Sequence, residues 1–382
     1  MDTSVHIRLW HSDFWLMAIA NLLLSTSITM LIPTLPHWLL CVEGLSSQET
    51  GVAMAAFAVG LFLPGAFCSY LVQRYRRNMV CVWAIIVLAL TQLAPFYLPT
   101  RSVEAISALR MLQGAAFGLA QMILTSTLII DTCESHQRTE ANHSSTWFGR
   151  FALSIGPMSG LLIVQWLGFE AVTWLAASCC LLSVVLILLV HFPFRVPANA
   201  LHVFSCDRFF LVSAWPLFVN LLLIMVALGL LFTCSLNEQF YGMLMIGFLL
   251  ALLAQRFIFR EAELKSEVVS GLLLIIAALL IVLRSVSSPL CSPFLGLGIG
   301  IVGARFLLFF IKLSHHCQRG TAQSTFMLAW ESGMAVGLGL GYGCFDAVGT
   351  QTLVFTALGL VAIALLLYVS IVHRWFMTHK SR

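Results

Sequence analysis

Residues 209–233 read FFLVSAWPLFVNLLLIMVALGLLFT and contain no charged side chain. An apolar run of about 20 residues is long enough to cross the hydrocarbon core of a bilayer as an α-helix. Strands that cross membranes instead alternate apolar and polar residues over about 10 positions, which this run does not do. Inside lipid a spanning segment must satisfy its own backbone hydrogen bonds, and a helix does so. The run is therefore predicted to be a transmembrane helix.

Comparable apolar runs recur along the whole chain. Of its 382 residues, 60% are hydrophobic and only 9% are charged, whereas a soluble domain carries roughly 25% charged residues. So few charges cannot cover a water-exposed surface, and an ordinary soluble protein is excluded. We predict an all-α integral membrane protein with twelve transmembrane helices, at residues 14–40, 48–72, 79–98, 104–130, 144–168, 170–192, 209–233, 240–257, 266–285, 290–313, 322–345 and 350–372.

The positions of Lys and Arg predict the orientation of these helices. If the N-terminus is cytoplasmic, fifteen Lys and Arg fall in cytoplasmic segments, and only Arg101 and Arg284 fall outside. Short cytoplasmic loops are enriched in these two residues, so both termini are expected to be cytoplasmic. We expect a multi-pass protein of the cell membrane, in a bacterial inner membrane, with the lipid bilayer as its main partner. A net charge of only +4 gives no indication of nucleic-acid binding.

The two halves of the chain repeat each other at an offset of about 181 residues. Four matches fall at the same helix position in each half: Gln73-Arg74-Tyr75 with Gln255-Arg256-Phe257, Gly114 and Gly118 with Gly296 and Gly300, Gln137-Arg138 with Gln318-Arg319, and Gly156 with Gly337. In the last match, Arg150 aligns with Glu331. Parallel repeats related by an axis along the membrane normal are one transporter architecture. We therefore predict an N-terminal six-helix bundle at 1–192, a cytoplasmic linker at 193–208, and a C-terminal six-helix bundle at 209–382.

Three short motifs resemble those of the major facilitator superfamily. Residues 65–77, GAFCSYLVQRYRR, resemble the family's signature loop between helices two and three. Arg110-Met-Leu-Gln113-Gly114 is similar to the helix-four motif Arg-x-x-Gln-Gly, and Gly156-Pro157-Met-Ser-Gly160 is similar to the helix-five motif Gly-Pro-x-x-Gly. The resemblance implies two six-helix bundles that rock about a central site and move a small molecule by alternating access.

The sequence departs from these motifs at several positions. Gln73 and Arg76 stand where the family usually has Asp and Gly, and that Asp helps to lock one conformational state. The helix-five motif in its fuller form is associated with antiporters, but Ala152 and Leu161 replace two of its glycines. The resemblance and the glycine pattern together nominate a set of gating and conformational residues: Gly65, Gln73, Arg74, Arg77, Gly156, Pro157, Gly160 and Gly337.

Glu331 is the candidate for proton coupling, because it is the carboxylate placed well inside a predicted span. A charge in hydrocarbon costs on the order of 2.5–3.5 kcal/mol, so it marks function or a compensated pair. At ~1.5 Å per residue, Arg305 reaches a similar depth in the same half and is the predicted partner. A permanent ion pair that only holds helices together is the alternative. Arg150 lies at that depth too, but in the opposite half.

Helix four supplies a second candidate for coupling. Arg110 and Gln113 are three residues apart and share one helix face. The resemblance implies that this face points to the central cavity and that Arg110 couples to the proton. The structural alternative is an arginine that extends toward the outer membrane surface.

Polar residues inside the spans nominate a substrate cavity. Asn21, Ser25 and Thr29 lie on one face of the first helix at i, i+4 and i+8. In the family, helices one, four, seven and ten line the cavity, so the resemblance adds Gln113, Gln121 and Asn220. Hydrogen bonds between neighbouring helices are the alternative explanation for each of these side chains.

The sequence favours a proton-coupled secondary transporter that exports a small neutral, cationic or amphipathic organic solute. Uptake of a sugar or similar metabolite by proton symport, and a non-transporting sensor or scaffold, are the alternatives. An enzyme is not expected, because no nucleotide-binding Gly-x-x-x-x-Gly-Lys motif and no clustered catalytic set is found. No cofactor or metal is expected, the eleven cysteines are interpreted as structural thiols, and the chain is expected to act as a monomer.

Overall fold

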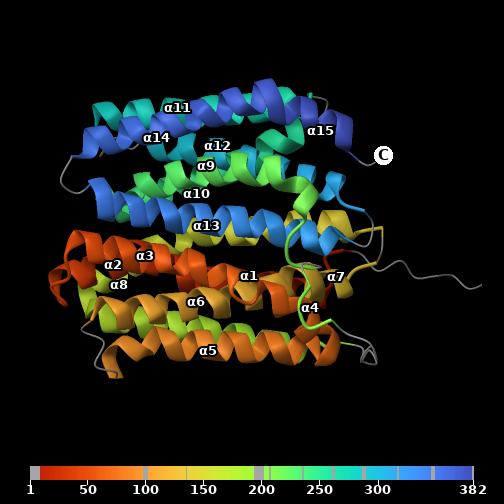
Figure 1. Ribbon diagram of the computed structural model, residues 1–382, viewed down its shortest axis with the longest axis horizontal. Helices are drawn as coiled ribbons and strands as arrows, with labels where there is room; N and C mark the ends of the chain where they lie inside the picture. Colours follow the sequence, from red (N-terminus) through yellow and green to blue (C-terminus); the bar gives the residue numbers. More distant parts are fainter. Residues whose placement is uncertain are drawn as a thin grey trace, which may run out of the picture.

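The protein is described by a computed structural model that covers residues 9–97, 102–134, 136–192, 202–205, 208–234, 236–259, 263–285, 290–315, 318–345 and 349–380. Within these ranges every regular element is a helix. Most of the helices lie side by side along the long axis of the molecule (Figure 1). The predicted all-helical membrane fold is confirmed.

The first half of the chain supplies six spans. Span one comprises α1 (Ser12–Thr29) and α2 (Leu31–Cys41), and span two comprises α3 (Ser47–Phe62) and α4 (Gly65–Arg74). Span three is α5 (Arg77–Tyr97). Span four runs through α6 (Val103–Ile123), the π-helical turn η1 (Leu124–Leu128) and α7 (Ile129–Asp131). Spans five and six are the two arms of α8 (Arg138–Leu189).

The second half supplies the other six. Span seven begins with the 3₁₀ turn η2 (Val212–Ala214) and continues as α9 (Trp215–Leu231). Spans eight to eleven are α10 (Glu238–Phe257), α11 (Leu264–Arg284), α12 (Cys291–Leu313) and α13 (Arg319–Phe345). Span twelve runs through α14 (Thr350–Leu367), the π-helical turn η4 (Tyr368–Val372) and α15 (His373–His379).

The count of twelve spans is reached in three steps. Nine helical segments of the described chain are long and apolar enough to cross a membrane, and the α3–α4 pair, bent by 45°, is a tenth. The 52-residue helix α8 breaks at Gly168, whose φ of 82° only glycine adopts readily, so it makes two spans. The glycine-rich and more polar α13 is the twelfth. Each span predicted from the sequence overlaps one of these, although α8 begins at Arg138 rather than at residue 144.

Glycines that match in the two halves make matching contacts. Gly114 of α6 packs against the backbone of Gly60 in α3, and Gly296 of α12 packs in the same way against Gly247 in α10. Gly156 of α8 lies against α1, and its repeat mate Gly337 of α13 lies against α9. The internal repeat is therefore visible in the packing. Residues 193–201, 206 and 207 of the predicted linker lie outside the described residues, so the bundle boundaries remain a prediction.

Helix α13 lies between the two groups of helices (Figure 1). Near its C-terminal end, the backbones of Gly339 and Gly343 touch Gly51 of α3. At its other end, Gly320 lies against Ser126 of η1. The two halves are thus in contact near both ends of α13.

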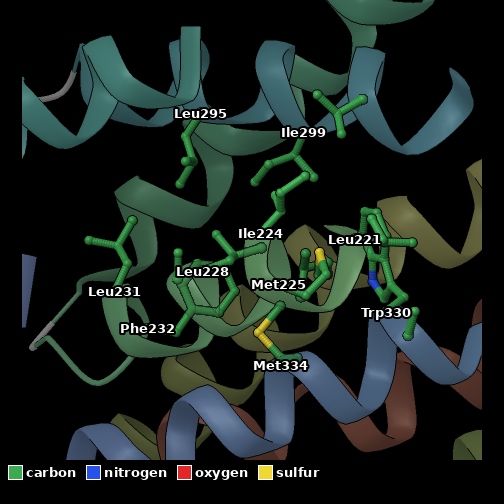
Figure 2. Packing of buried hydrophobic residues seen from close by; sticks show 14 of the residues in the cluster. Leu221, Ile224, Met225, Leu228, Leu231, Phe232, Leu295, Ile299, Trp330 and Met334 are labelled. Carbon is green, nitrogen blue, oxygen red and sulfur yellow. The ribbon is translucent and has the colours of Figure 1, made fainter. Parts of the chain in front are cut away.

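An apolar cluster fixes α13 to its own half. Figure 2 shows Leu221 and Leu228 of α9 between Leu295 of α12 and Trp330 of α13. These side chains are buried, so the three helices form a packed unit. Trp330 lies at the edge of this unit, where the space between the halves begins.

Candidate functional site

A small cavity lies between the two halves at the middle of α13. Its volume is about 40 Å³, which is room for roughly three water molecules. The first half contributes α1, α6, η1 and α8, and the second half contributes α13. The lining side chains with polar groups are Asn21, Ser25, Gln121, Thr125, Thr146, Arg150, Gln323, Trp330 and Glu331.

Hydrogen bonds hold the wall that the first half contributes. Gln121 donates through Nε2 to Oδ1 of Asn21 at 2.8 Å, and Asn21 donates through Nδ2 to the carbonyl oxygen of Ser145 at 2.9 Å. The π-helical turn η1 follows directly after α6 and brings Thr125 to the cavity. Such turns often mark functional positions in helices. Oε1 of Gln121 is buried and accepts no hydrogen bond.

Arg150 is the most unusual side chain of the cavity. It is 2% exposed, and Nε, Nη1 and Nη2 all lack a hydrogen-bond partner. Its guanidinium carbon lies 4.4 Å from the ring centre of Trp147 and 5.9 Å from that of Trp330. Attraction to the two ring faces offsets part of the cost of burying the charge. A Cβ atom at Gly303 of α12 would lie 2.7 Å from Cζ3 of Trp330 and 3.1 Å from Nε of Arg150, so α12 packs closely on both side chains.

Glu331 faces the same cavity from α13. No salt bridge within 4.0 Å joins it to any cation in the described chain. About two turns before it on α13, Gln323 donates through Nε2 to Oγ1 of Thr146 at 3.1 Å, which links the halves beside the cavity. The cavity therefore contains the carboxyl group of Glu331 and the guanidinium group of Arg150. The two residues come from opposite halves and occupy positions that match in the repeat.

The structure gives Arg305 a different partner from the predicted one. Nε of Arg305 donates to Oε2 of Glu267, which is fully buried at the start of α11. The predicted Glu331–Arg305 pair is not formed in this conformation, because α12 presents Arg305 to α11 rather than to α13. Glu267 was not singled out from the sequence because it lies at the end of a span, where a charged residue is ordinary.

Arg110 and Gln113 lie in a separate part of the first half. Nη1 of Arg110 donates to Oε1 of Gln113 at 2.8 Å, and Nε2 of Gln113 donates to the carbonyl oxygen of Thr91 at 2.9 Å. The guanidinium also lies 4.8 Å from the ring centre of Phe57. Arg110, Gln113 and Trp38 line a second cavity of about 20 Å³. In this conformation the helix-four motif does not share a cavity with Glu331.

Two other polar residues predicted for the cavity make contacts between helices instead. Oγ1 of Thr29 donates to the carbonyl oxygen of Ala152 in α8 at 2.8 Å. Nδ2 of Asn220 donates to the carbonyl oxygen of Ala364 in α14 at 2.9 Å. Of the predicted set, the structure therefore brings Asn21, Ser25 and Gln121 to the central cavity and places Thr29, Gln113 and Asn220 elsewhere.

The loop between spans two and three is held within the first half. Arg77 at the start of α5 forms an ion pair with Asp131 at the end of α7. Gln73, which replaces the usual Asp, donates to Oγ of Ser69 at 3.0 Å, and Arg74 is exposed. Gly65 lies against the ring of Phe209, the residue at which the second half begins. This loop therefore touches the other half through Gly65.

The helix-five motif packs against span one. A Cβ atom at Gly160 would lie 2.7 Å from the carbonyl oxygen of Met30, and one at Gly156 would overlap Thr29. Pro157 lies inside α8, where it cannot donate a backbone hydrogen bond. The motif thus permits close approach between α8 and α1, directly beyond the cavity.

Several cavity residues were not identified from the sequence: Thr146, Gln323 and, as a cavity residue, Arg150. Composition gives no signal for the first two, because each is an ordinary residue in a helix. Arg150 did carry a signal. It matches Glu331 in the repeat, and two matching positions close to a symmetry axis face each other across it.

Comparison with known proteins decides the family. The sequence matches the Major Facilitator Superfamily over residues 17–337. The chain belongs to the major facilitator superfamily. It is therefore a multi-pass membrane transporter, and the resemblance found in the three motifs is confirmed. A search of the curated proteins found no match.

Solved structures of the superfamily share the fold along nearly the whole chain. The human organic anion transporter MFSD10 (TETRAN) has a TM-score of 0.67 at 17% identity, covering 93% of this chain and 98% of its own. A bacterial homologue of the iron transporter ferroportin, in an outward-facing state, has a TM-score of 0.65 at 14% identity, covering 96% and 99%. The POT family transporter PepTSo has a TM-score of 0.69 at 11% identity, covering 97% and 99%. Identities this low establish a shared fold alone.

Within the described residues, no group of three His, Cys, Asp or Glu side chains is arranged to hold a metal ion. The chemistry available in the central cavity is therefore that of its amides, hydroxyls, indole, guanidinium and carboxyl group. These can bind a solute and a proton.

Proposed function

We propose that the chain is a proton-coupled secondary transporter that moves a small organic solute by alternating access, in the direction of export. The central cavity supports this proposal, because it lies between the two halves and carries Glu331 without an ion-pair partner. A carboxyl group changes its affinity for a proton when its solvent and neighbouring charges change. Opening the cavity first to one side and then to the other would change both for Glu331.

The helix-five motif supports the direction of export. Gly156, Pro157 and Gly160 match the shorter form of the helix-five motif, whose fuller form the superfamily associates with antiporters, and they pack α8 closely on α1. The fold relatives are described as an organic anion transporter, a homologue of an iron transporter and a POT family transporter, so the fold by itself leaves the solute open.

Proton symport for uptake is the second candidate, and one observation favours it. Arg150 and Glu331 line the same cavity. A proton on Glu331 and a solute beside Arg150 could therefore occupy the cavity together instead of displacing each other. In an exchanger, the proton and the solute bind in turn.

Purified protein in liposomes tests the proposal. Solutes that raise the melting temperature would be loaded inside liposomes together with a pH-sensitive dye. The liposomes would then be diluted into buffer without solute, so that the solute gradient points outward. Exchange for protons should acidify the lumen, whereas symport should make it alkaline. Exit of labelled solute with no change of luminal pH would refute proton coupling, and no exit of any stabilising solute would refute transport.

A further inference from the structure

The central cavity contains hydrogen-bond donors that no protein group satisfies. The guanidinium group of Arg150 is buried, and all three of its nitrogens are unpartnered. Nε1 of the neighbouring Trp147 is buried and unpartnered too. A buried charge that lacks both a partner and hydrogen bonds is costly, so in native proteins it is normally paired. No described residue of the first half pairs with Arg150 in this conformation.

We propose that the partner of Arg150 is a carboxylate, or a similar anionic group, on the transported solute. This inference rests on the proposed function, since it names the substrate class of the same cavity. A guanidinium group presents its donors in a flat fork that matches a carboxylate in two parallel hydrogen bonds. Trp147 and Trp330 flank the guanidinium of Arg150, so an anion in the plane of the fork would lie beside both indoles.

The other polar groups of the cavity indicate which functional groups the rest of the solute carries. Oε1 of Gln121 and Oε1 of Gln323 are buried acceptors without a donor, while the Nε2 atoms of both side chains are already engaged. They would accept hydrogen bonds from N–H or O–H groups. The solute that fits these groups is a small organic anion that also carries a hydroxyl, amide or amine group. This replaces the neutral or cationic solute expected from the sequence.

Glu331 is the rival partner for Arg150. It lines the same cavity but forms no ion pair within 4.0 Å in the described chain. If Arg150 served only to neutralise Glu331 in another conformation, a variant without both charges would regain the solute binding that is lost when one charge is removed. If Arg150 binds the solute, removing both would not restore binding of an anion.

The size of the cavity sets the condition for binding. At about 40 Å³ it holds water but no organic solute. The anion would therefore enter when the halves separate at one end, and the cavity would close around it. Binding should slow the exchange between conformations and raise the melting temperature.

The test measures binding and does not require transport. Acetate, 4-hydroxybenzoate and indole-3-acetate would each be compared with the matching carboxamide and the matching primary amine, at millimolar concentrations. The readouts are the melting temperature and the quenching of tryptophan fluorescence. The proteins are wild type, Arg150→Gln, Arg150→Lys, the double variant Arg150→Gln with Glu331→Gln, and Arg110→Gln as the matched buried arginine of the second cavity.

We expect at least one carboxylate to bind wild type better than its amide and its amine. Arg150→Gln should weaken that carboxylate at least about 10-fold, as loss of one partner of a buried charge pair does. Arg150→Lys should keep part of the preference, and the double variant should not regain it. Arg110→Gln should keep the preference for the carboxylate, whatever its effect on transport.

Three results would overturn the inference: binding of no carboxylate at all, equal binding of a carboxylate and its amide, or a preference that survives Arg150→Gln. Recovery of carboxylate binding in the double variant would assign Arg150 to Glu331 instead. Failure of this inference is separable from failure of the proposed function. If transport of an amine or amide is coupled to proton movement in liposomes, the proposed function holds without this inference. If an anion binds but its addition causes no proton movement, this inference holds without proton coupling.

Discussion

Three arginines within the spans differ in their surroundings: Arg110 and Arg150 are buried, and Arg305 is partly exposed. Arg305 is paired with the carboxylate of Glu267, and Arg110 with the amide oxygen of Gln113. Arg150 has only the faces of two tryptophan rings. An arginine with a fixed partner stabilises the helices that it joins, whereas an arginine without one is available to a ligand.

Glu331→Gln should separate proton coupling from solute binding. The amide imitates the protonated carboxyl group but cannot release a proton. Proton-driven accumulation should be lost, while exchange of labelled for unlabelled solute across the liposome membrane should remain. The fold should be retained, because Arg305 keeps its partner Glu267. For this one variant, yield and melting temperature report on the fold, and pH-driven flux reports on proton coupling.

Glu267→Gln is the matched control for that variant. It makes the same chemical change in a carboxylate that has an arginine partner and lies outside the cavity. Loss of one partner of a buried pair costs about 3 kcal/mol or more. Its melting temperature should therefore fall below that of Glu331→Gln. Well-folded Glu331→Gln protein with wild-type proton-driven transport would exclude Glu331 as the proton carrier.

Arg110→Lys should strongly reduce transport while leaving membrane insertion normal. Lysine keeps the charge but lacks the planar fork that donates to Gln113 and packs on the ring of Phe57. The position of Gln113 against Thr91 would be lost with it. Flux is compared with the amount of inserted protein. Undiminished flux per inserted molecule would leave Arg110 with a structural role that lysine can fill.

At the residue scale, the sequence predicted the depth of the charged residues in the spans but not which of them meet. Depth along a helix follows from a fixed rise per residue, and it placed Glu331, Arg305 and Arg150 at one level. The direction in which a side chain leaves its helix depends on how neighbouring helices pack. Packing turned Arg305 toward α11 and left Arg150 facing Glu331 across the cavity.

At the scale of helices, the contact between α3 and α13 joins the two halves near the C-terminal end of α13, and we predict that it controls closure there. Gly51 and Gly339 touch through their backbones, and a Cβ atom at Gly339 would lie 2.6 Å from the Cβ atom of Ala55. Gly343 faces the same helix one turn further on, but a Cβ atom there would meet only Cα of Gly51, at 3.8 Å. The two glycines therefore form a matched pair.

Gly339→Ala should hold this end of the cavity open, whereas Gly343→Ala should not. Both changes raise helix propensity by about 1 kcal/mol, so the difference between them isolates the contact with α3. In a background without other reactive cysteines, a cysteine at Gln323 should react faster with an impermeant maleimide in the Gly339→Ala protein. Equal labelling rates in the two variants would show that this contact does not govern closure.

The helices themselves could largely be predicted from the sequence, because a bilayer demands long apolar runs whatever the surroundings. Their irregularities could not. The π-helical turn at Leu124–Leu128 and the bend between α3 and α4 carry no signal in hydropathy. Both depend on how neighbouring helices pack, and the π-helical turn contributes Thr125 to the cavity.

At the scale of the molecule, the orientation in the membrane is open to a direct test. Tags at either terminus should both be cytoplasmic. Glu43 follows span one and Arg76 follows span two, so these residues lie at opposite ends of the bundle. A cysteine at Glu43 should be labelled from outside by an impermeant reagent, and one at Arg76 only from inside. The reverse pattern would invert the assigned orientation.

The opposite charges of Arg150 and Glu331 also set how the transporter would respond to voltage. With both groups ionised, the empty cavity has no net charge. A monovalent anion that enters with a proton leaves that sum at zero, so symport would be electrically silent. An anion that leaves in exchange for a proton moves two elementary charges, each equivalent to about 2.3 kcal/mol per 100 mV. A potassium diffusion potential at equal pH should therefore drive export but leave symport unchanged.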